Sequence, residues 1–136
     1  AADAISNQGL DAKVLTSGLD TAVLEYLCDD SNAVEFVNGD YWIAGTMATV
    51  ALMNYLDGTP LEDADGNKVF VDNIMPFQIT PDTYETFKKT FIDNPCYSAA
   101  EIQAMDGKYN PDFNYDAFMK VISDYSLDER AAAAAK

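Results

Sequence analysis

The sequence predicts an α/β protein with a mostly parallel sheet and a helical tail. Two β-branched runs, residues 13–17 and 33–37, have the length and composition of buried strands. A helical pattern follows each run, over residues 21–29 and 41–56, and strands that alternate with helices favour a parallel sheet. Several further helical patterns follow from residue 81 onward. We therefore predict a partial doubly wound parallel sheet with a helical C-terminal extension.

Local signals place the ends of these elements. Asp20 is a candidate N-cap for the helix over residues 21–29, and residues 57–60 (Asp-Gly-Thr-Pro) end the helix over residues 41–56. Residues 69–80 are extended, and Pro76 within them marks an edge, a bulge or a crossing between two strands. Later helices are expected to begin at Thr-Pro-Asp (80–82), at capping boxes 98–101 and 126–129, and at Asn114.

Composition narrows the classes of function. The 136 residues predict one domain, or one and a fraction, and 23 acidic against 8 basic residues give a formal net charge of -15. The electrostatic field of this negative net charge repels phosphate groups, which argues against nucleic acid or an anionic membrane surface as a partner. The chain has no histidine, which excludes histidine-based triads and histidine-ligated zinc, and we predict no metal and no cofactor. It opens within a helical pattern, so we expect a fragment, a processed product or an engineered segment.

Two polar turns form the leading candidate site. They follow the predicted strands at residues 17–20 and 38–40 and contain Asp20, Asn38 and Asp40. Neighbouring parallel strands end at the same edge of a sheet, where α/β proteins commonly bind ligands. Carboxylate and amide groups suit sugar hydroxyls, and Tyr41 or Trp42 could add an apolar ring face. The alternative, that Asp20 and Asp40 only cap helices, stays open here.

Other constellations are weaker. Residues 62–67 (Glu-Asp-Ala-Asp-Gly-Asn) match part of a calcium-binding loop. The later ligands of that loop are missing, so a solvated hairpin is favoured. Asp29 and Asp30, with Glu25 and Glu35, offer an acid/base pair, although adjacent loop acids are usually solvated. Cys28 and Cys96 could pair or stay free. A set of aromatic residues at helical spacing is expected in the core, with a partner groove as the alternative: Tyr84, Phe87, Phe91, Phe113, Tyr115 and Phe118.

The order of these pieces resembles one family over about residues 1–90. A helix ends at Gly9, a strand leads into Gly18-Leu19-Asp20, and a second strand ends at Asn38. An apolar helix with an early glycine, Gly45, then ends in Leu56-Asp57-Gly58. The extended run finally leads into residues 79–84. This order is similar to the C-terminal part of type I periplasmic binding proteins, the sugar-type solute-binding components of ABC importers. Leu19 replaces the usual aromatic residue, and Asn38-Gly39-Asp40 replaces the usual Gln-Asp-Pro.

The resemblance implies two α/β lobes that close over a sugar or similar solute, without catalysis. Residues 1–93 would be the C-terminal segment of that fold, with 1–37 in the second lobe, 41–75 in the first lobe, and hinges near 38–40 and 76. Residues 94–136 would be a helical extension. The ligand-binding residues carried by this segment would be Asp20 and Asn38, with Asp40 and Trp42 beside them.

The resemblance also implies partners and a location. The partners would be the solute, a membrane permease of an ABC importer, and a missing N-terminal lobe or a second copy of the chain. The location would be extracytoplasmic, as a periplasmic protein or a cell-surface lipoprotein. Two other classes stay open: a secreted acidic hydrolase that uses Asp/Glu pairs, and a small α/β interaction protein that uses its aromatic C-terminal helices.

Overall fold

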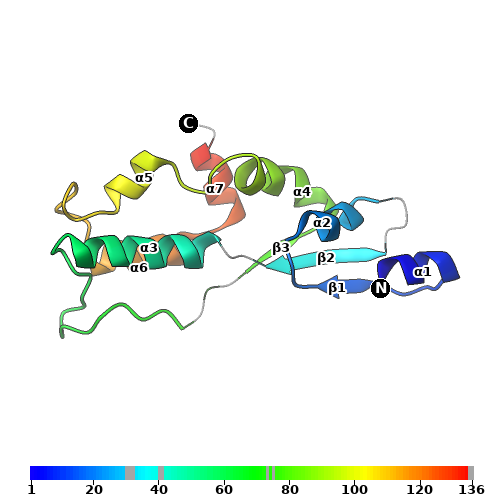
Figure 1. Ribbon diagram of the computed structural model, residues 1–136, viewed down its shortest axis with the longest axis horizontal. Helices are drawn as coiled ribbons and strands as arrows, with labels where there is room; N and C mark the ends of the chain where they lie inside the picture. The colour runs from blue at the N-terminus through cyan, green and yellow to red at the C-terminus, as the bar shows by residue number, and fades with distance from the viewer. Residues whose placement is uncertain (30–32, 40–41, 73, 75, 135–136) are drawn as a thin grey trace. The chain divides into compact units, whose positions relative to one another are not determined.

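The chain divides into two compact units. The computed structural model describes residues 1–29, 33–39, 42–72, 74 and 76–134. Unit 1 comprises Ala1–Asp40 and Pro76–Asn94, and unit 2 comprises Tyr41–Met75 and Pro95–Lys136. The chain therefore changes unit after residues 40, 75 and 94. Figure 1 labels the elements of both units.

Unit 1 is built on a three-stranded mixed sheet. Its strands are β1 (Val14–Thr16), β2 (Val34–Gly39) and β3 (Phe77–Ile79), in that spatial order. β1 pairs with β2 in parallel, and β3 pairs with β2 antiparallel. The predicted α/β class is confirmed, whereas the sheet is mixed rather than mostly parallel. A parallel neighbour needs a crossover that packs on the same sheet, but the segment before β3 runs through unit 2.

Helices cover one face of this sheet. They are α2 (Thr21–Leu27) and α4 (Pro81–Phe87), which pack on β2 and β3 and on each other (Figure 1). α4 continues as a π-helical turn, η1 (Lys88–Ile92), and α1 (Ala2–Gln8) is tied to α2 by a 2.8 Å hydrogen bond from the Tyr26 hydroxyl to Asp3 Oδ1. The core consists of apolar side chains from strands and helices: Leu24, Leu27, Val34, Val37, Ile79, Phe87 and Phe91.

The predicted extended run over residues 69–80 is divided between the units. Of its described residues, only Phe77–Ile79 form a strand, directly after Pro76, and Val69 and Val71 pack against the core of unit 2. Exposure alternates from residue 69 to 72 as in a half-buried strand, yet these residues have no strand partner in the part of the chain that the structure describes. Their alternating pattern is typical of a strand, but no described strand forms backbone hydrogen bonds with them.

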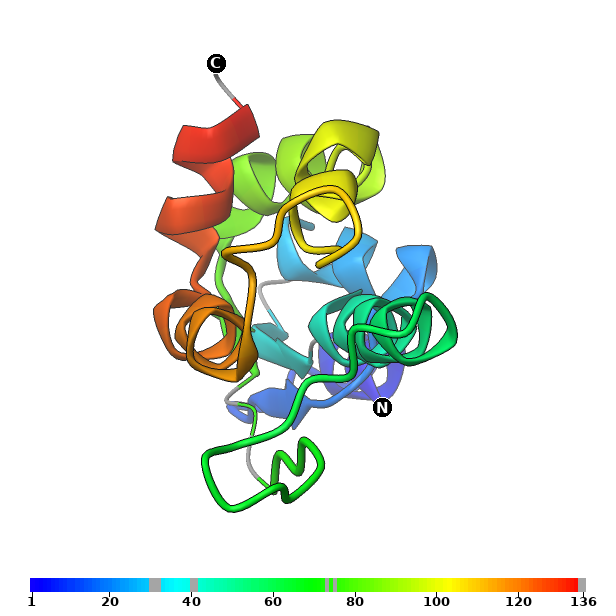
Figure 2. The same ribbon diagram turned by 90° about the vertical axis from the view of Figure 1, so that its left-hand side faces the viewer.

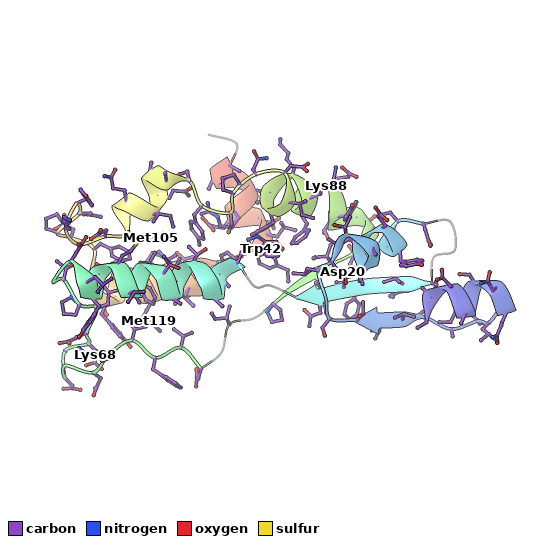
Figure 3. The ribbon with its side chains drawn as sticks, viewed as in Figure 1. Asp20, Trp42, Lys68, Lys88, Met105 and Met119 are labelled. Atoms are coloured by element: carbon purple, nitrogen blue, oxygen red, sulfur yellow. The ribbon has the colours of Figure 1, made fainter. Side chains whose placement is uncertain are left out.

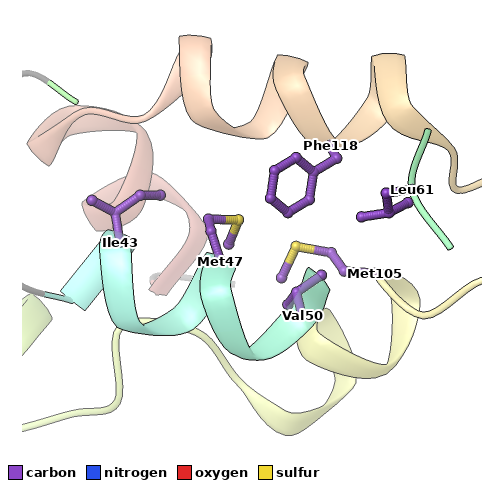
Figure 4. Packing of buried hydrophobic residues seen from close by; sticks show 6 residues of the cluster. All are labelled: Ile43, Met47, Val50, Leu61, Met105 and Phe118. Atoms are coloured by element: carbon purple, nitrogen blue, oxygen red, sulfur yellow. The ribbon is translucent and has the colours of Figure 1, made fainter. Parts of the chain in front are cut away.

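Unit 2 is helical and contains the predicted C-terminal extension. Its helices are α3 (Trp42–Leu56), α5 (Ala99–Ala104), α6 (Tyr115–Asp124) and α7 (Leu127–Ala134). Figure 2 looks roughly along the axes of α3 and α6. Their shared core, drawn in Figure 4, brings Phe118 of α6 toward the apolar stripe of α3. Its buried members are Ile43, Met47, Val50, Leu61, Met105 and Phe118. Residues 95–136 thus belong with α3 and do not form a separate unit.

The uncharged helix α3 buries only one stripe within unit 2. Ile43, Met47, Val50 and Asn54 follow helical spacing and are buried. On the other faces Leu52 is 56% exposed and Leu56 is 71% exposed. Because α3 has no charged residue, its remaining faces expose apolar side chains that the described packing does not cover.

The predicted helix starts are largely confirmed. Asn114 caps α6 by accepting the Ala117 N–H at 3.0 Å, and Ser98 and Glu101 form the expected capping box of α5. The second box is only half formed. Ser126 Oγ accepts the Glu129 N–H at 3.1 Å, but the Glu129 carboxylate bonds to Arg130 Nη1 at 3.3 Å. None of the described helices is both long and apolar enough to cross a membrane.

Candidate functional site

The parallel pairing of β1 and β2 brings the turn after β1 to the edge of the sheet where β2 ends, and Asn38 and Gly39, which were predicted in a turn, instead extend β2 and pair with β3. Thr16, the last residue of β1, pairs with Val37 of β2. The turn with Gly18, Leu19 and Asp20 leaves the sheet at this edge, and Asn38 directly follows Val37 on β2. The juxtaposition that was predicted from strand order is therefore present within unit 1.

A close contact fixes the turn after β1 against the end of β2. A Cβ atom built on Gly39 would lie 3.1 Å from Leu19 Cγ and 3.2 Å from Leu19 Cδ1. Such distances are tighter than ordinary van der Waals contacts, so a larger residue at position 39 would require the Leu19 side chain to shift by a few tenths of an ångström. Leu19 thus covers the backbone of Gly39, and its neighbour Asp20 is held beside the same strand end.

Asp20 has a structural role that its sequence position predicted. Its Oδ1 atom accepts the backbone N–H of Val23 at 3.0 Å and so caps α2. Within the described residues, Oδ2 accepts no hydrogen bond, and the side chain is exposed. The cap therefore uses one carboxylate oxygen and leaves the other available to a bound molecule.

Asn38 carries the more informative observation. It lies on β2 opposite Gln78 of β3, and its Oδ1 atom is buried without a hydrogen-bond partner in the described part of the chain. A buried oxygen that lacks a donor costs about 1–3 kcal/mol relative to a satisfied one. A buried oxygen of this kind calls for a donor outside the described residues, such as an ordered water or a bound molecule. Asn38 is thus the strongest single indication of a binding site in unit 1.

The other two predicted ligand-binding residues are not described as part of this edge. Trp42 is the first residue of α3 and belongs to unit 2, whereas Asp20 immediately precedes α2 in unit 1; Figure 3 labels both residues. Asp40 lies outside the described residues. Within unit 1, the described residues of the edge are Asp20, Asn38, Gly39 and Leu19.

The weaker constellations resolve into structural roles. Asp63 Oδ1 accepts the N–H groups of Asp65 and Asn67 at 2.9 and 2.8 Å, and Oδ2 accepts Asn67 Nδ2 at 2.9 Å. These bonds lower the pKa of Asp63 and close a tight hairpin, as the favoured alternative to a calcium loop predicted. In the described ranges, no three acidic or cysteine side chains gather closely enough to hold a metal ion.

Several other predicted features have simple outcomes. Phe87, Phe91 and Phe118 are buried, as expected of core aromatics, and the rings of Phe87 and Phe91 stack with centroids 5.2 Å apart. The two cysteines do not form a disulfide with each other: Cys28 is exposed and Cys96 is buried. Of the proposed acid/base group, Asp30 lies outside the described residues. The hydrogen bond to Asp3 is the main cause that raises the pKa of Tyr26, and the charges of Asp29 and Glu25 add smaller contributions.

Sequence reasoning missed the buried arginine of α7. Arg130 is the chain's one arginine, and its side chain is 4% exposed. Its Nε donates to the Cys96 carbonyl at 3.0 Å, its Nη2 bonds to Glu101 Oε1 at 2.7 Å, and its guanidinium lies 3.9 Å from the centroid of the Tyr97 ring. The run of alanines that follows it, residues 131–135, gives no sign in the sequence of a buried contact. The signal was a lone arginine one turn into a capped helix.

Comparisons with known proteins add no relative. Neither a protein-family model, nor a curated protein, nor a solved structure matches this chain.

Proposed function

We propose that this chain is the solute-binding part of an ABC importer and binds a sugar or sugar-like molecule without catalysis. The observation that carries the proposal is the buried, unpartnered Oδ1 of Asn38 at the edge where Asp20 leaves the neighbouring strand. Both groups are hydrogen-bond acceptors with unused capacity. A molecule with several hydroxyl groups would donate to both.

The chemistry of this edge favours a neutral polyol over an ion. The free carboxylate oxygen of Asp20 and the net charge of -15 disfavour an anionic solute. The described residues offer no acidic cluster that would hold a metal ion, so a sugar need not be bound through one. A solute whose hydroxyl groups donate hydrogen bonds to Asn38 and Asp20 fits these acceptors best. Leu19, which lies over Gly39, adds a small apolar surface.

The division of the chain supports a two-lobe protein of the doubly wound type. The changes of unit after residues 40 and 75 fall where the resemblance to type I periplasmic binding proteins puts the hinges. In the complete protein, lobes would close on the solute by hinge rotation and then dock on a permease. This function implies an extracytoplasmic location, as a periplasmic protein or a cell-surface lipoprotein.

The exposed apolar side of α3 supports a further lobe. Leu52, Tyr55 and Leu56 are all more than half exposed although the helix has no charged residue. Exposed apolar patches of this kind mark surfaces that another protein layer covers. We propose that the cover is the rest of the first lobe, or a second copy of the chain.

A thermal-shift screen of the complete protein tests the solute site. Hexoses, pentoses, polyols and nucleosides are added separately, and at least one should raise the melting temperature, because a ligand that binds only the native state stabilises it. The variant Asp20→Asn keeps the cap, since asparagine caps as well as aspartate, and should weaken binding of that solute at least roughly tenfold. Asp11→Asn is the matched control: the same charge change, on an exposed residue before β1.

The same screen can reject the proposal. A response to no solute contradicts it, as does a solute whose affinity is unchanged in Asp20→Asn and in Asn38→Leu. Hydrolysis of a tested glycoside, with loss of that activity in acidic-residue variants, would favour the hydrolase alternative.

A further inference from the structure

Unit 2 contains a cavity that the solute-binding proposal does not use. It has a volume of about 410 Å³ and is formed by α5, α6, α7 and the segments beside them. This is within the range of small-molecule sites, about 300–1,000 Å³. Six of its lining residues matter to what it could bind: Tyr97, Met105, Phe113, Ala117, Val121 and Arg130. All of them belong to unit 2, whereas Asp20 and Asn38 belong to unit 1.

The charges around the cavity are already paired. Arg130 bonds to Glu101 at 2.7 Å and to Glu129 at 3.3 Å, and Lys120 bonds to Asp124 at 2.6 Å. These five residues are the charged members of the lining. An ionic ligand would have to break one of these pairs, so the cavity suits a neutral ligand.

The apolar part of the lining favours an aromatic ligand. Phe113 and Tyr97 offer aromatic rings, and Met105 offers a thioether, which makes favourable contacts with ring edges. Ala117 and Val121 are short side chains on α6 and leave room for a flat group.

One polar atom in the lining residues lacks a partner. Tyr97 Oη is buried and makes no hydrogen bond to the described residues. Burial raises the pKa of Tyr97, even though the neighbouring Arg130 opposes this effect, so the hydroxyl keeps its proton and can donate it. A carbonyl oxygen on the ligand would satisfy this donor.

We propose that this cavity binds a small, neutral aromatic molecule with a carbonyl acceptor, held by Met105 and Phe113 and by a hydrogen bond from Tyr97 Oη. The proposal is independent of the solute site in unit 1. It goes beyond transport of sugars, because a site of this composition offers few partners for a polyol.

Coumarin, a neutral bicyclic lactone, is a suitable probe. In a saturation-transfer NMR or calorimetric titration of the complete protein, we expect a Kd of about 1 mM or tighter. Ala117→Trp should abolish binding by filling the cavity, and Ala104→Trp is a second filling variant from α5 in case the first does not fold. Tyr97→Phe should weaken binding roughly fivefold, the effect of one neutral hydrogen bond.

Matched controls separate the cavity from other apolar surfaces. Ala100→Trp adds the same group to an exposed position of α5 outside the lining and should leave the Kd unchanged. Leu52→Lys removes apolar surface from α3 and should also leave it unchanged. The absence of coumarin binding, binding that persists in the folded filling variants, or an unchanged Kd in Tyr97→Phe would each overturn the proposal. Because these readouts use neither Asp20 nor a sugar, failure here is distinguishable from failure of the solute site.

Discussion

Each of the two units contains an asparagine with a buried side-chain oxygen, and the two oxygens have opposite surroundings. In unit 2, Asn54 is completely buried and all its polar atoms are satisfied. Its Nδ2 donates to the Val50 and Met105 carbonyls at 2.9 and 2.8 Å, and its Oδ1 accepts Gly107 N at 2.9 Å and Thr59 Oγ1 at 3.3 Å. In unit 1, Asn38 Oδ1 has no partner among the described residues.

This difference separates an asparagine that stabilises the fold from one whose oxygen, under the proposed function, accepts a hydrogen bond from a solute. Asn54 ties the end of α3 to the loop after α5, and Gly107 is essential to the contact because a Cβ there would lie 2.9 Å from Thr59 Cβ. Asn38 holds no such network. The same substitution at both sites, asparagine to the similarly sized leucine, should therefore give opposite results for stability and for binding.

Asn54→Leu should give the largest loss of stability. It would leave the Gly107 N–H and the Met105 carbonyl without their partners in a buried place, and each such loss costs about 1–3 kcal/mol. We expect the free energy of unfolding of unit 2 to fall by about 3 kcal/mol, measured by urea denaturation. A change below about 1 kcal/mol would mean that water or repacking satisfies these groups, and would remove the contrast with Asn38.

Arg130→Met should give the next largest effect. Methionine keeps much of the apolar stem but loses the bonds to the Cys96 carbonyl and Glu101 and the stack on Tyr97. We expect about 2 kcal/mol of destabilisation, less than for a wholly buried pair, because Glu101 is 37% exposed. Lys120→Met, which removes an exposed pair with Asp124, is the control and should cost under about 1 kcal/mol. Equal effects would show that Arg130 is not the anchor of α7.

A smaller effect should appear in the pH dependence of stability. Partial burial raises the pKa of Glu101, but bonds from Arg130 and Ser98 outweigh it and lower the pKa below its usual value. A lowered pKa in the folded state contributes stability above the unfolded pKa of about 4.3, and that contribution is lost as pH falls through the folded pKa. Glu101→Gln should therefore lose stability at neutral pH and approach the parent protein in acid. Parallel curves for the two proteins from pH 7 to pH 3 would contradict this.

Much of the fold followed from local signals in the sequence. The ends of β1, α2 and β2 were predicted within about two residues, because β-branched runs and the Asp20 cap act over short distances. The direction of β3 was not predictable in this way. It depends on how the chain returns from unit 2, and a short strand such as Phe77–Ile79 carries no mark of its direction.

The candidate site was predictable only in part, for the same reason. The placement of Asp20 and Asn38 at one edge follows from the general geometry of parallel strands, and their role with a ligand stays a prediction. The contact of Leu19 with Gly39 and the burial of Arg130 against Tyr97 depend on tertiary packing. For Arg130 the partners are also distant in sequence, because it bonds to Cys96 and Glu101, which lie 34 and 29 positions away. No residue next to Arg130 in the sequence indicates these partners.

Asn38→Leu should have the smallest effect on stability and the largest on solute binding. The substitution removes an oxygen that the described fold leaves without a donor, and it places an apolar side chain at a half-buried position of β2, opposite Gln78 of β3. Loss of the unsatisfied oxygen favours the folded state, while the different shape of leucine and its polar neighbour oppose it, so we expect the free energy of unfolding to stay within about 1 kcal/mol of the parent. Affinity for the solute found in the thermal-shift screen should fall at least roughly tenfold, because the donor hydroxyl loses its acceptor. A loss of about 3 kcal/mol, equal to that of Asn54→Leu, would instead make Asn38 a structural residue. Since both variants carry the same chemical change, only the surroundings of the two amides can account for different outcomes.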